Sequence, residues 1–215
     1  MWLNTSYLHP GDVPNGRWES SMQTRSEYEV MVRDRSERDK VALKVGDLAP
    51  DFEIERLSSS GVRTGESFRL SQALGRPIGL ILGSYTWPPF RLDAVRLNEI
   101  YETFKDRMDF YCVYIQEAHP TDGWLVARNL NDEVLHEQPD TIEGRARIAE
   151  VWMLKLDIRM PMLLDNMSNE VDTLYAALPG RLFVLDSDGF VTFWTVIGSP
   201  GFDVAAWEKA VKLAI

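Results

Sequence analysis

The sequence predicts one α/β domain, a central β-sheet with helices on both faces, preceded by a polar N-terminal extension. Three observations support this prediction. Short apolar segments alternate with amphipathic segments over residues 45–215, which is typical of a sheet layered between helices. Toward the C-terminus, two apolar runs flank a tight turn and a last amphipathic segment follows. The length of 215 residues is sufficient to bury one sizeable core.

Residues 1–44 are expected to form a charged extension outside the domain at 45–215. Acidic and basic side chains are mixed between Ser20 and Lys44, with few large apolar residues among them. This composition predicts a solvated helix or a loosely held arm. Its scattered aromatic residues, such as Trp18, could pack on the domain or on a second subunit, which leaves a homodimer open.

The domain is expected to begin at Val45. Phe52, Ile54 and, less cleanly, Leu57 alternate with polar residues, so this segment is predicted to be a half-buried strand. Residues 58–61, Ser-Ser-Ser-Gly, are expected to form the turn that ends it.

The sequence pattern in the middle of the chain predicts a strand, a helix and a second strand. Residues 77–82 form an apolar run short enough to be a buried strand. Residues 91–106 have one apolar face, which predicts a helix, and Pro88 and Pro89 suit its first turn because they lack N–H groups. Residues 110–115 are again apolar and predict the next strand.

The C-terminal half continues the alternation. Asp140 and Glu143 have the spacing of a capping box, so a helix is expected to start there. The later elements are predicted as a strand at 160–165, a helix at 170–177, a hairpin at 181–194 around an Asp-Gly turn, and a helix at 205–215.

The charge and the cysteine content exclude several classes of function. Acidic residues outnumber basic ones by 33 to 23, giving a net charge of −10, which argues against nucleic acid or an anionic membrane as a partner. No apolar run approaches the roughly 20 residues of a membrane span, and the first residues do not resemble a signal peptide. A soluble cytoplasmic protein is therefore expected, with neither a metal nor a cofactor, since no cysteine pair or zinc pattern exists.

Cys112 is the only cysteine of the chain. It lies within the apolar run at 110–115, and free cysteine is among the residues most often buried. A small core residue is the expectation, and a catalytic Cys112 is the alternative.

A motif of unusual composition follows the strand at 77–82. It reads Gly83-Ser84-Tyr85-Thr86-Trp87-Pro88-Pro89-Phe90. It resembles the active-site motif of the iodothyronine deiodinases, Gly-Ser-Cys-Thr-selenocysteine-Pro-Pro-Phe, at six of eight positions. Tyr85 stands where the family has cysteine, and Trp87 stands where it has selenocysteine.

A second motif, at residues 116–124, reads Gln-Glu-Ala-His-Pro-Thr-Asp-Gly-Trp. It is similar to a second deiodinase signature, Glu-Glu-Ala-His-x-Ser-Asp-Gly-Trp. Both motifs follow neighbouring strands at their carboxyl ends, where ligands bind in α/β sheets. The segment Gly46-Asp47-Leu48-Ala49-Pro50-Asp51-Phe52 also looks like the entry of peroxiredoxin-like proteins. The resemblance therefore implies a thioredoxin-like fold of the peroxiredoxin type over residues 45–215.

The resemblance also implies roles for individual residues. Ser84 and Thr86 flank the nucleophile and could hydrogen-bond it, although Thr86 could instead only cap the helix. His119 would donate or relay a proton, a role that imidazole suits near neutral pH, or it is a structural loop residue. His136 and Arg181 would contact the ligand; the alternative is a solvated histidine and a strand-edge arginine.

Four further positions complete this comparison. Tyr85 is expected to border the substrate. Gly180 replaces the glutamate of the family's Glu-Arg-Leu-Tyr segment, a third departure. Asp122 and Trp124 are expected to hold the loop, the first by accepting backbone hydrogen bonds and the second by packing beneath it.

The substitution at Trp87 removes the group that performs the family's reaction, the reductive dehalogenation of an iodinated aromatic by a selenol or thiol. Indole forms no nucleophilic anion, and the phenol of Tyr85, with a pKa of about 10, is largely protonated at pH 7. The expected function is that of a deiodinase-like oxidoreductase that is inactive as written.

Three interpretations remain open. The tryptophan could stand for a selenocysteine, whose codon UGA differs by one base from UGG. The chain could be a non-catalytic module whose pocket, lined by Trp87, Tyr85 and His119, binds an aromatic small molecule. It could also be an interaction protein that assembles through its charged arm.

Overall fold

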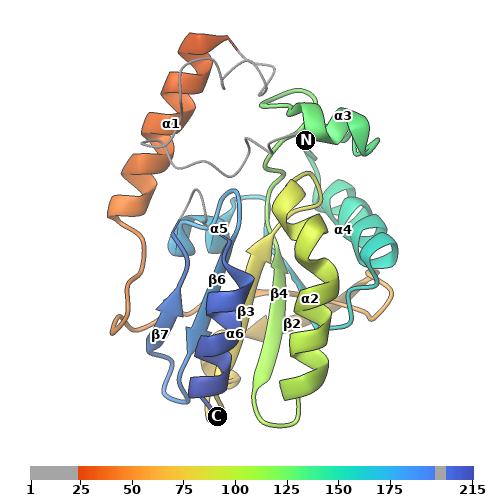
Figure 1. The fold of residues 1–215 in the computed structure, drawn as a ribbon. Coiled ribbons are helices and arrows are strands. Elements are labelled where there is room, and N and C mark those ends of the chain that lie inside the picture. The colour runs from red at the N-terminus through yellow and green to blue at the C-terminus, as the bar shows by residue number, and fades with distance from the viewer. Residues whose placement is uncertain (1–23, 197–201) are drawn as a thin grey trace.

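The computed structural model describes residues 24–196 and 202–215. Within this part of the chain, the strands form one seven-stranded mixed sheet in the order β2-β1-β5-β4-β3-β6-β7 (Figure 1). Their bounds are β1 Glu53–Leu57, β2 Arg63–Arg69, β3 Ile78–Gly83, β4 Asp109–Tyr114, β5 Met162–Leu164, β6 Arg181–Leu185 and β7 Val191–Trp194.

The centre of the sheet is β3, in which every residue is buried. It pairs in parallel with β4, from Ile78 opposite Asp109 to Gly83 opposite Tyr114. On its other edge it pairs antiparallel with β6, and β6 pairs antiparallel with β7. The predicted hairpin at 181–194 is therefore confirmed, and β3 ends at the middle of one sheet edge.

The outer part of the sheet contains a strand that the sequence analysis did not predict. β2 pairs antiparallel with β1, and only Phe68 of its seven residues is buried. An exposed edge strand has no apolar alternation to reveal it. Leu57 departs from the apolar pattern set by Ile54 because it points to the opposite face of the sheet, which is also buried.

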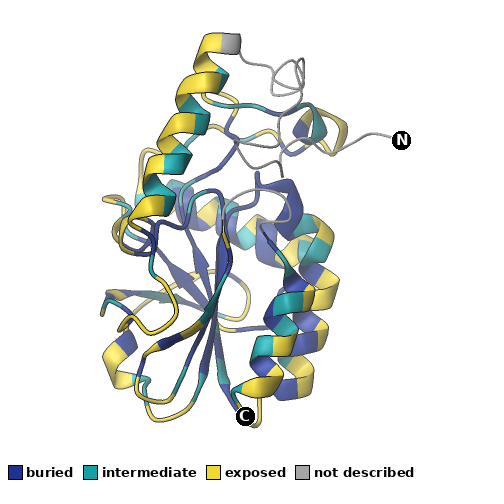
Figure 2. Ribbon diagram, turned by 60° about the vertical axis from the view of Figure 1, so that its left-hand side comes forward, coloured by how far each residue is buried: buried dark blue, intermediate teal, exposed yellow. Residues whose placement is uncertain are grey.

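Helices cover the sheet on both faces, as predicted. α2 Pro88–Phe104, α4 Ile142–Leu156 and α6 Val204–Leu213 pack on one face over a cluster of buried apolar side chains. α5 Glu170–Tyr175 and the 3₁₀ helix η4 Leu70–Gln72 contribute to a second cluster on the other face. Figure 2 shows the buried residues concentrated in the strands between these layers.

Two helix starts differ from the predictions. α2 begins at Pro88, three residues before the expected start at residue 91, and both prolines lie in its first turn as predicted. The N-cap of α4 is Thr141, whose hydroxyl accepts a hydrogen bond from the backbone N of Gly144, so the predicted capping box starting at Asp140 is wrong by one residue. Threonine competes well with aspartate as an N-cap, and the extended backbone at Thr141 suits that position.

The polar extension contains a helix, α1 Arg25–Lys40, whose N-cap Thr24 forms a capping box with Glu27. Much of α1 is exposed, as a solvated helix should be. Two ion pairs nevertheless attach it to the domain, one from Arg38 to Asp172 at 3.1 Å and one from Asp39 to the buried Arg181. Trp18, which was expected to pack on the domain or a partner, lies outside the described residues.

Two smaller findings complete the fold. A short helix, α3 Ala127–Asn131, lies in the long connection between β4 and α4 and was not predicted. None of the helices in the described ranges combines the length and the apolar character that crossing a membrane requires.

Candidate functional site

Both sequence motifs lie at the same edge of the sheet. The first occupies the corner between β3 and α2, and the second follows β4, the parallel neighbour of β3. The backbone N of Ile115 donates to the carbonyl oxygen of Gly83 at 3.1 Å, which extends the pairing beyond both strands. The backbone N of Ala118 donates to Oγ of Ser84 at 3.1 Å. Ser84 therefore joins the two loops, and its side chain is fully buried.

Glu117 forms the centre of a buried polar cluster at this junction. Its Oε2 accepts a hydrogen bond from the backbone N of Thr86 at 2.9 Å and another from the Thr86 hydroxyl at 2.6 Å. Its Oε1 accepts the hydroxyl of Tyr114. Burial raises the pKa of Glu117 above its ordinary value, although the hydrogen bonds from Thr86 and Tyr114 act in the opposite direction. The carboxyl group thereby fixes the loop after β4 to the corner before α2.

Thr86 does not cap α2. The N-cap residue is Trp87, and no side chain caps the helix there. The Thr86 hydroxyl instead donates to Glu117 and accepts a hydrogen bond from the backbone N of His119 at 3.0 Å. The side chain of Asn129 closes the arrangement by donating to the carbonyl oxygen of Thr86 at 2.8 Å.

His119 is fully buried, and its ring orientation is fixed. Nδ1 lies 3.0 Å from the carbonyl oxygen of Trp124, and because a carbonyl only accepts, Nδ1 carries the proton. Burial, followed by the positive charge of Arg35, holds the pKa of His119 well below its ordinary value. The ring is therefore neutral at neutral pH.

The other ring nitrogen of His119, Nε2, is buried and has no hydrogen-bond partner among the described residues. In this tautomer it presents a lone pair. It can accept a hydrogen bond or a proton, and it could donate a proton only after first binding one.

Trp87 is packed as a core residue and is 4% exposed. Its ring meets that of Phe202 edge-on, with 4.7 Å between centroids and 82° between planes. It belongs to the same apolar cluster as α2, α4 and α6. The position at which a nucleophile was expected therefore holds a ring that faces the interior.

Gly180 makes room for this ring. A Cβ atom added at Gly180 would lie 2.0 Å from Cζ3 of Trp87 and 2.4 Å from Cε3. Such distances are far below van der Waals contact, so every other residue type at position 180 would force the indole to move. The backbone at Gly180 has no left-handed conformation that would otherwise call for glycine.

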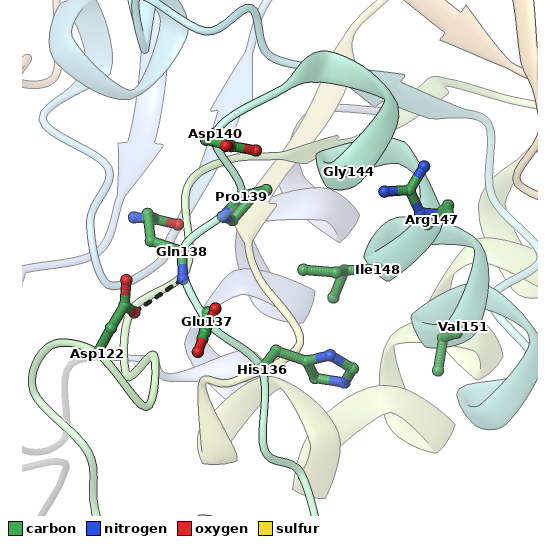
Figure 3. Close-up of a pocket in the computed structure, with 10 residues that line it drawn as sticks. All are labelled: Asp122, His136, Glu137, Gln138, Pro139, Asp140, Gly144, Arg147, Ile148 and Val151. Atoms are coloured by element: carbon green, nitrogen blue, oxygen red, sulfur yellow. Dashed lines mark hydrogen bonds between the residues drawn. The ribbon is translucent and has the colours of Figure 1, made fainter.

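Tyr85 and His136 lie side by side, with 5.5 Å between ring centroids. Tyr85 is buried, and burial raises the pKa of its phenol. His136 borders a polar hollow of about 560 Å³ next to the start of α4, shown in Figure 3. Asp122 borders the same hollow, and its carboxylate accepts the backbone N of Gln138 at 2.9 Å, which confirms its expected loop-holding role.

Arg181 lies apart from these rings. Its Nε donates to the carbonyl oxygen of Ala176 at 2.6 Å, one Nη donates to that of Thr195 at 2.7 Å, and the other pairs with Asp39. Arg181 is buried and joins the start of β6 to α1. In this structure its guanidinium holds the scaffold together.

Cys112 is fully buried in the sheet, as expected of a core residue. Burial raises the pKa of its thiol well above the ordinary value, so it is not a ready nucleophile. Within the described ranges, no group of three or more His, Cys, Asp or Glu side chains is placed to hold a metal ion.

The structure brings the corner residues and His119 together. Trp87, Tyr85 and His119, which were expected to line a pocket, are all buried. Two features were not predicted from the sequence: the role of Glu117 and the contact of Gly180 with Trp87. Glu117 could have been noticed as a member of the second motif. The contact could have been suspected because, relative to the family motifs, residue 87 is larger and residue 180 is smaller.

The fold defines the class of protein. A DsbE-like putative thiol:disulfide interchange protein from Chlorobium tepidum superposes with a TM-score of 0.54 at 18% identity, over 80% of this chain and 99% of that one. A 2-Cys peroxiredoxin from Plasmodium vivax gives a TM-score of 0.54 at 14% identity, over 78% and 80%. The chain has a thioredoxin-like fold.

The sequence comparisons then identify the family. The profile of iodothyronine deiodinases matches residues 11–204, so the chain belongs to the iodothyronine deiodinase family. It is 33% identical to type I iodothyronine deiodinase of Xenopus laevis over 127 residues, 59% of this chain and 48% of that protein. It is 31% identical to human thyroxine 5-deiodinase over 130 residues, 60% and 41% respectively. The chain spans about half the length of the curated relatives it matches.

Proposed function

We propose that this chain is a member of the deiodinase family that has lost the redox step and acts as a non-catalytic module that binds a small molecule. In this proposal Trp87 stands at the position of the family's selenocysteine, as the motif resemblance indicates. An oxidoreductase of the family needs a soft anionic nucleophile there, and an indole supplies none.

The packing of Trp87 against Gly180 is the observation that carries the proposal. The indole fills the corner, and residue 180 has no side chain where a Cβ would lie 2.0 Å from the ring. These residues are 93 positions apart in the sequence (180 − 87). Their sizes are complementary, because the large side chain of Trp87 occupies the space that a side chain at position 180 would need. A small selenol or thiol side chain at position 87 would leave the space over Gly180 unfilled, so the pair favours a genuine tryptophan over a misread selenocysteine.

No neighbouring group offers a substitute nucleophile. Burial raises the pKa values of the Cys112 thiol and of the Tyr85 phenol, so both are neutral at pH 7. His119 has a free lone pair on Nε2, but its ring is buried and is held by the hydrogen bond that Nδ1 donates to the carbonyl oxygen of Trp124. The fold and the loops of an oxidoreductase are retained around a corner without the reacting atom.

The first test determines residue 87 and the activity together. The protein purified from its native host is analysed by intact mass and selenium content, and then assayed for thiol-dependent release of iodide from iodinated aromatic compounds and for peroxidase turnover. A tryptophan mass without selenium and no turnover above the buffer rate are expected. Selenium at residue 87 would overturn the proposal.

The Cys112→Ala variant serves as the matched control of this assay. Turnover that persists in Cys112→Ala without selenium would also overturn the proposal, since it would require a nucleophile outside the groups considered above. Turnover that disappears in Cys112→Ala would show that the buried thiol becomes accessible, and the protein would then be an enzyme.

A further inference from the structure

A second hollow lies at the same end of the sheet, between α1 and the loop that carries the second motif. It is a groove of about 620 Å³, and most of its lining is apolar. The apolar side chains come from α1, from the loop around Trp124 and from the turn before β6: Val30, Met31, Ala118, Trp124 and Leu178. The corner residues discussed above do not line it, so the groove is a site of its own.

Arg35 is the unusual residue of this groove. It is half-buried, and its guanidinium carbon lies 4.3 Å from the centroid of the Trp124 ring. No oxygen among the described residues accepts a hydrogen bond from this guanidinium. The neighbouring Arg38, in contrast, is paired with Asp172 at 3.1 Å. A guanidinium has five N–H donors, so the groove contains a cation with unused hydrogen-bonding capacity.

The indole of Trp124 lies beside this cation. Trp124 is half-buried and lines the groove together with Arg35. An acidic group that accepts hydrogen bonds from Arg35 would therefore lie in a largely apolar setting, where a charge-assisted hydrogen bond is strong.

The charges and the shape of the lining restrict the ligand. Glu27 and Asp34 also line the groove, so a ligand with several negative charges would meet repulsion there. Trp124 is covered by Arg35 on one face and meets the His119 ring edge-on at 4.3 Å, which leaves little of the indole for stacking an aromatic ligand. Methionine, leucine and valine side chains instead suit an aliphatic body.

We propose that the groove binds an amphipathic monocarboxylate, with the carboxylate at Arg35 and an aliphatic chain along Val30, Met31 and Leu178. This inference deepens the proposed function and rests on it in one respect, that the ligand is held and not converted. A guanidinium that meets a carboxylate in an apolar groove makes charge-assisted hydrogen bonds, which are stronger than those between neutral groups.

The first experiment uses the wild-type protein and three probes with the same chain length: decanoate, decanol and decyltrimethylammonium, each below its aggregation concentration. Titration calorimetry is expected to show decanoate binding about tenfold or more tightly than decanol, and no binding of the cation. Equal affinities for decanoate and decanol, or absence of decanoate binding, would contradict the proposal.

The second experiment compares two arginines on the same helix. Arg35→Met removes the proposed anion contact and keeps an unbranched apolar stem, whereas Arg33→Met changes an exposed arginine outside the groove. Decanoate affinity should fall about tenfold in Arg35→Met and remain unchanged in Arg33→Met, with decanol affinity similar in both. Equal losses in the two variants would overturn the assignment of the carboxylate to Arg35. Thermal unfolding of each variant checks that the fold is retained.

The two proposals can fail separately. Decanoate contains no halogen, so its affinity does not depend on whether the corner at Trp87 performs redox chemistry. Turnover in the iodide assay would overturn the proposed function. It would not affect the assignment of the groove, which the calorimetry tests. Absence of decanoate binding would overturn the groove assignment and leave the turnover result as it stands.

Discussion

The corner at Trp87 and the groove beside α1 lie at the same end of the sheet and are constructed in opposite ways. At the corner, an indole, a phenyl ring and a glycine fit together, and Trp87 is 4% exposed. In the groove, about 620 Å³ is open, and the guanidinium of Arg35 lies over Trp124 without an acceptor among the described residues. A filled site and an unfilled one therefore exist on the same loops.

One line of contacts connects the two regions. Arg35 covers Trp124, the carbonyl of Trp124 accepts from His119, and the backbone of His119 donates to Thr86, the residue before Trp87. The polar hydrogen-bond arrangement therefore continues from the groove to the corner, where it ends at a tryptophan packed in the core. The following predictions examine this difference, starting with the largest expected effect.

Replacing Trp87 by alanine should cost about 3–5 kcal/mol of unfolding free energy, because it empties a space in the core. Urea denaturation measures the change. Val30→Ala, in the groove, should cost less than about 1 kcal/mol, since Val30 is 44% exposed. Similar costs for the two variants would remove the distinction between a filled corner and an open groove.

Gly180→Ala should destabilise the protein by about 2–3 kcal/mol, because the new methyl group overlaps the indole. The same substitution in a Trp87→Ala background should cost close to nothing, and a double-mutant cycle from urea denaturation gives the coupling. Additive effects would show that Gly180 and Trp87 are not matched to each other.

Thr86→Val should cost about 2 kcal/mol, since Glu117 loses a hydroxyl donor and the backbone N of His119 loses its acceptor, both in a buried setting. Thr103→Val is the control: Thr103 is exposed, and its hydroxyl donates only to the carbonyl of Glu99. That variant should change stability by no more than about 0.5 kcal/mol. Equal losses would mean that the polar cluster adds nothing to the stability of the corner.

The stability of the protein should decrease on acidification through His119. Its pKa in the folded state is well below the ordinary value of 6.5, so below pH 6.5 the unfolded chain binds a proton that the folded chain does not. This residue should lower the unfolding free energy by up to about 1.4 kcal/mol per pH unit. Urea midpoints of wild type and His119→Gln between pH 7.5 and 5.5 measure the difference. Parallel pH profiles would contradict the buried neutral imidazole.

The fold was predicted from the sequence where burial imposes a pattern. β3, β6 and the helices on the sheet have apolar faces, and all were expected close to their observed bounds. β2 was missed because six of its seven residues are exposed, and α3 was missed because five residues contain too little periodicity. Edge and loop elements depend on tertiary pairing that no local pattern records.

The site was predicted less completely. The motifs identified the corner and the loop of His119. Motif matching, however, compares one position at a time and does not show which side chains contact each other. The fit between Trp87 and Gly180 joins positions far apart in the sequence, and only the coordinates bring them together. Arg181 likewise matched a ligand-contact position, whereas its guanidinium is committed to Asp39 and to two backbone carbonyls. Spacing along a chain does not reveal which partners a long side chain finds.

The glycine facing Trp87 also has an evolutionary consequence. A single base change converts a tryptophan codon to a cysteine codon, so a thiol at position 87 is genetically close. In this background such a substitution would leave a hole in the core costing about 3–5 kcal/mol, a large part of the stability of an ordinary domain. A thiol at position 87 without that loss requires a second substitution at Gly180. The tryptophan at position 87 is thereby entrenched, and its replacement by cysteine is much less accessible than the genetic code suggests.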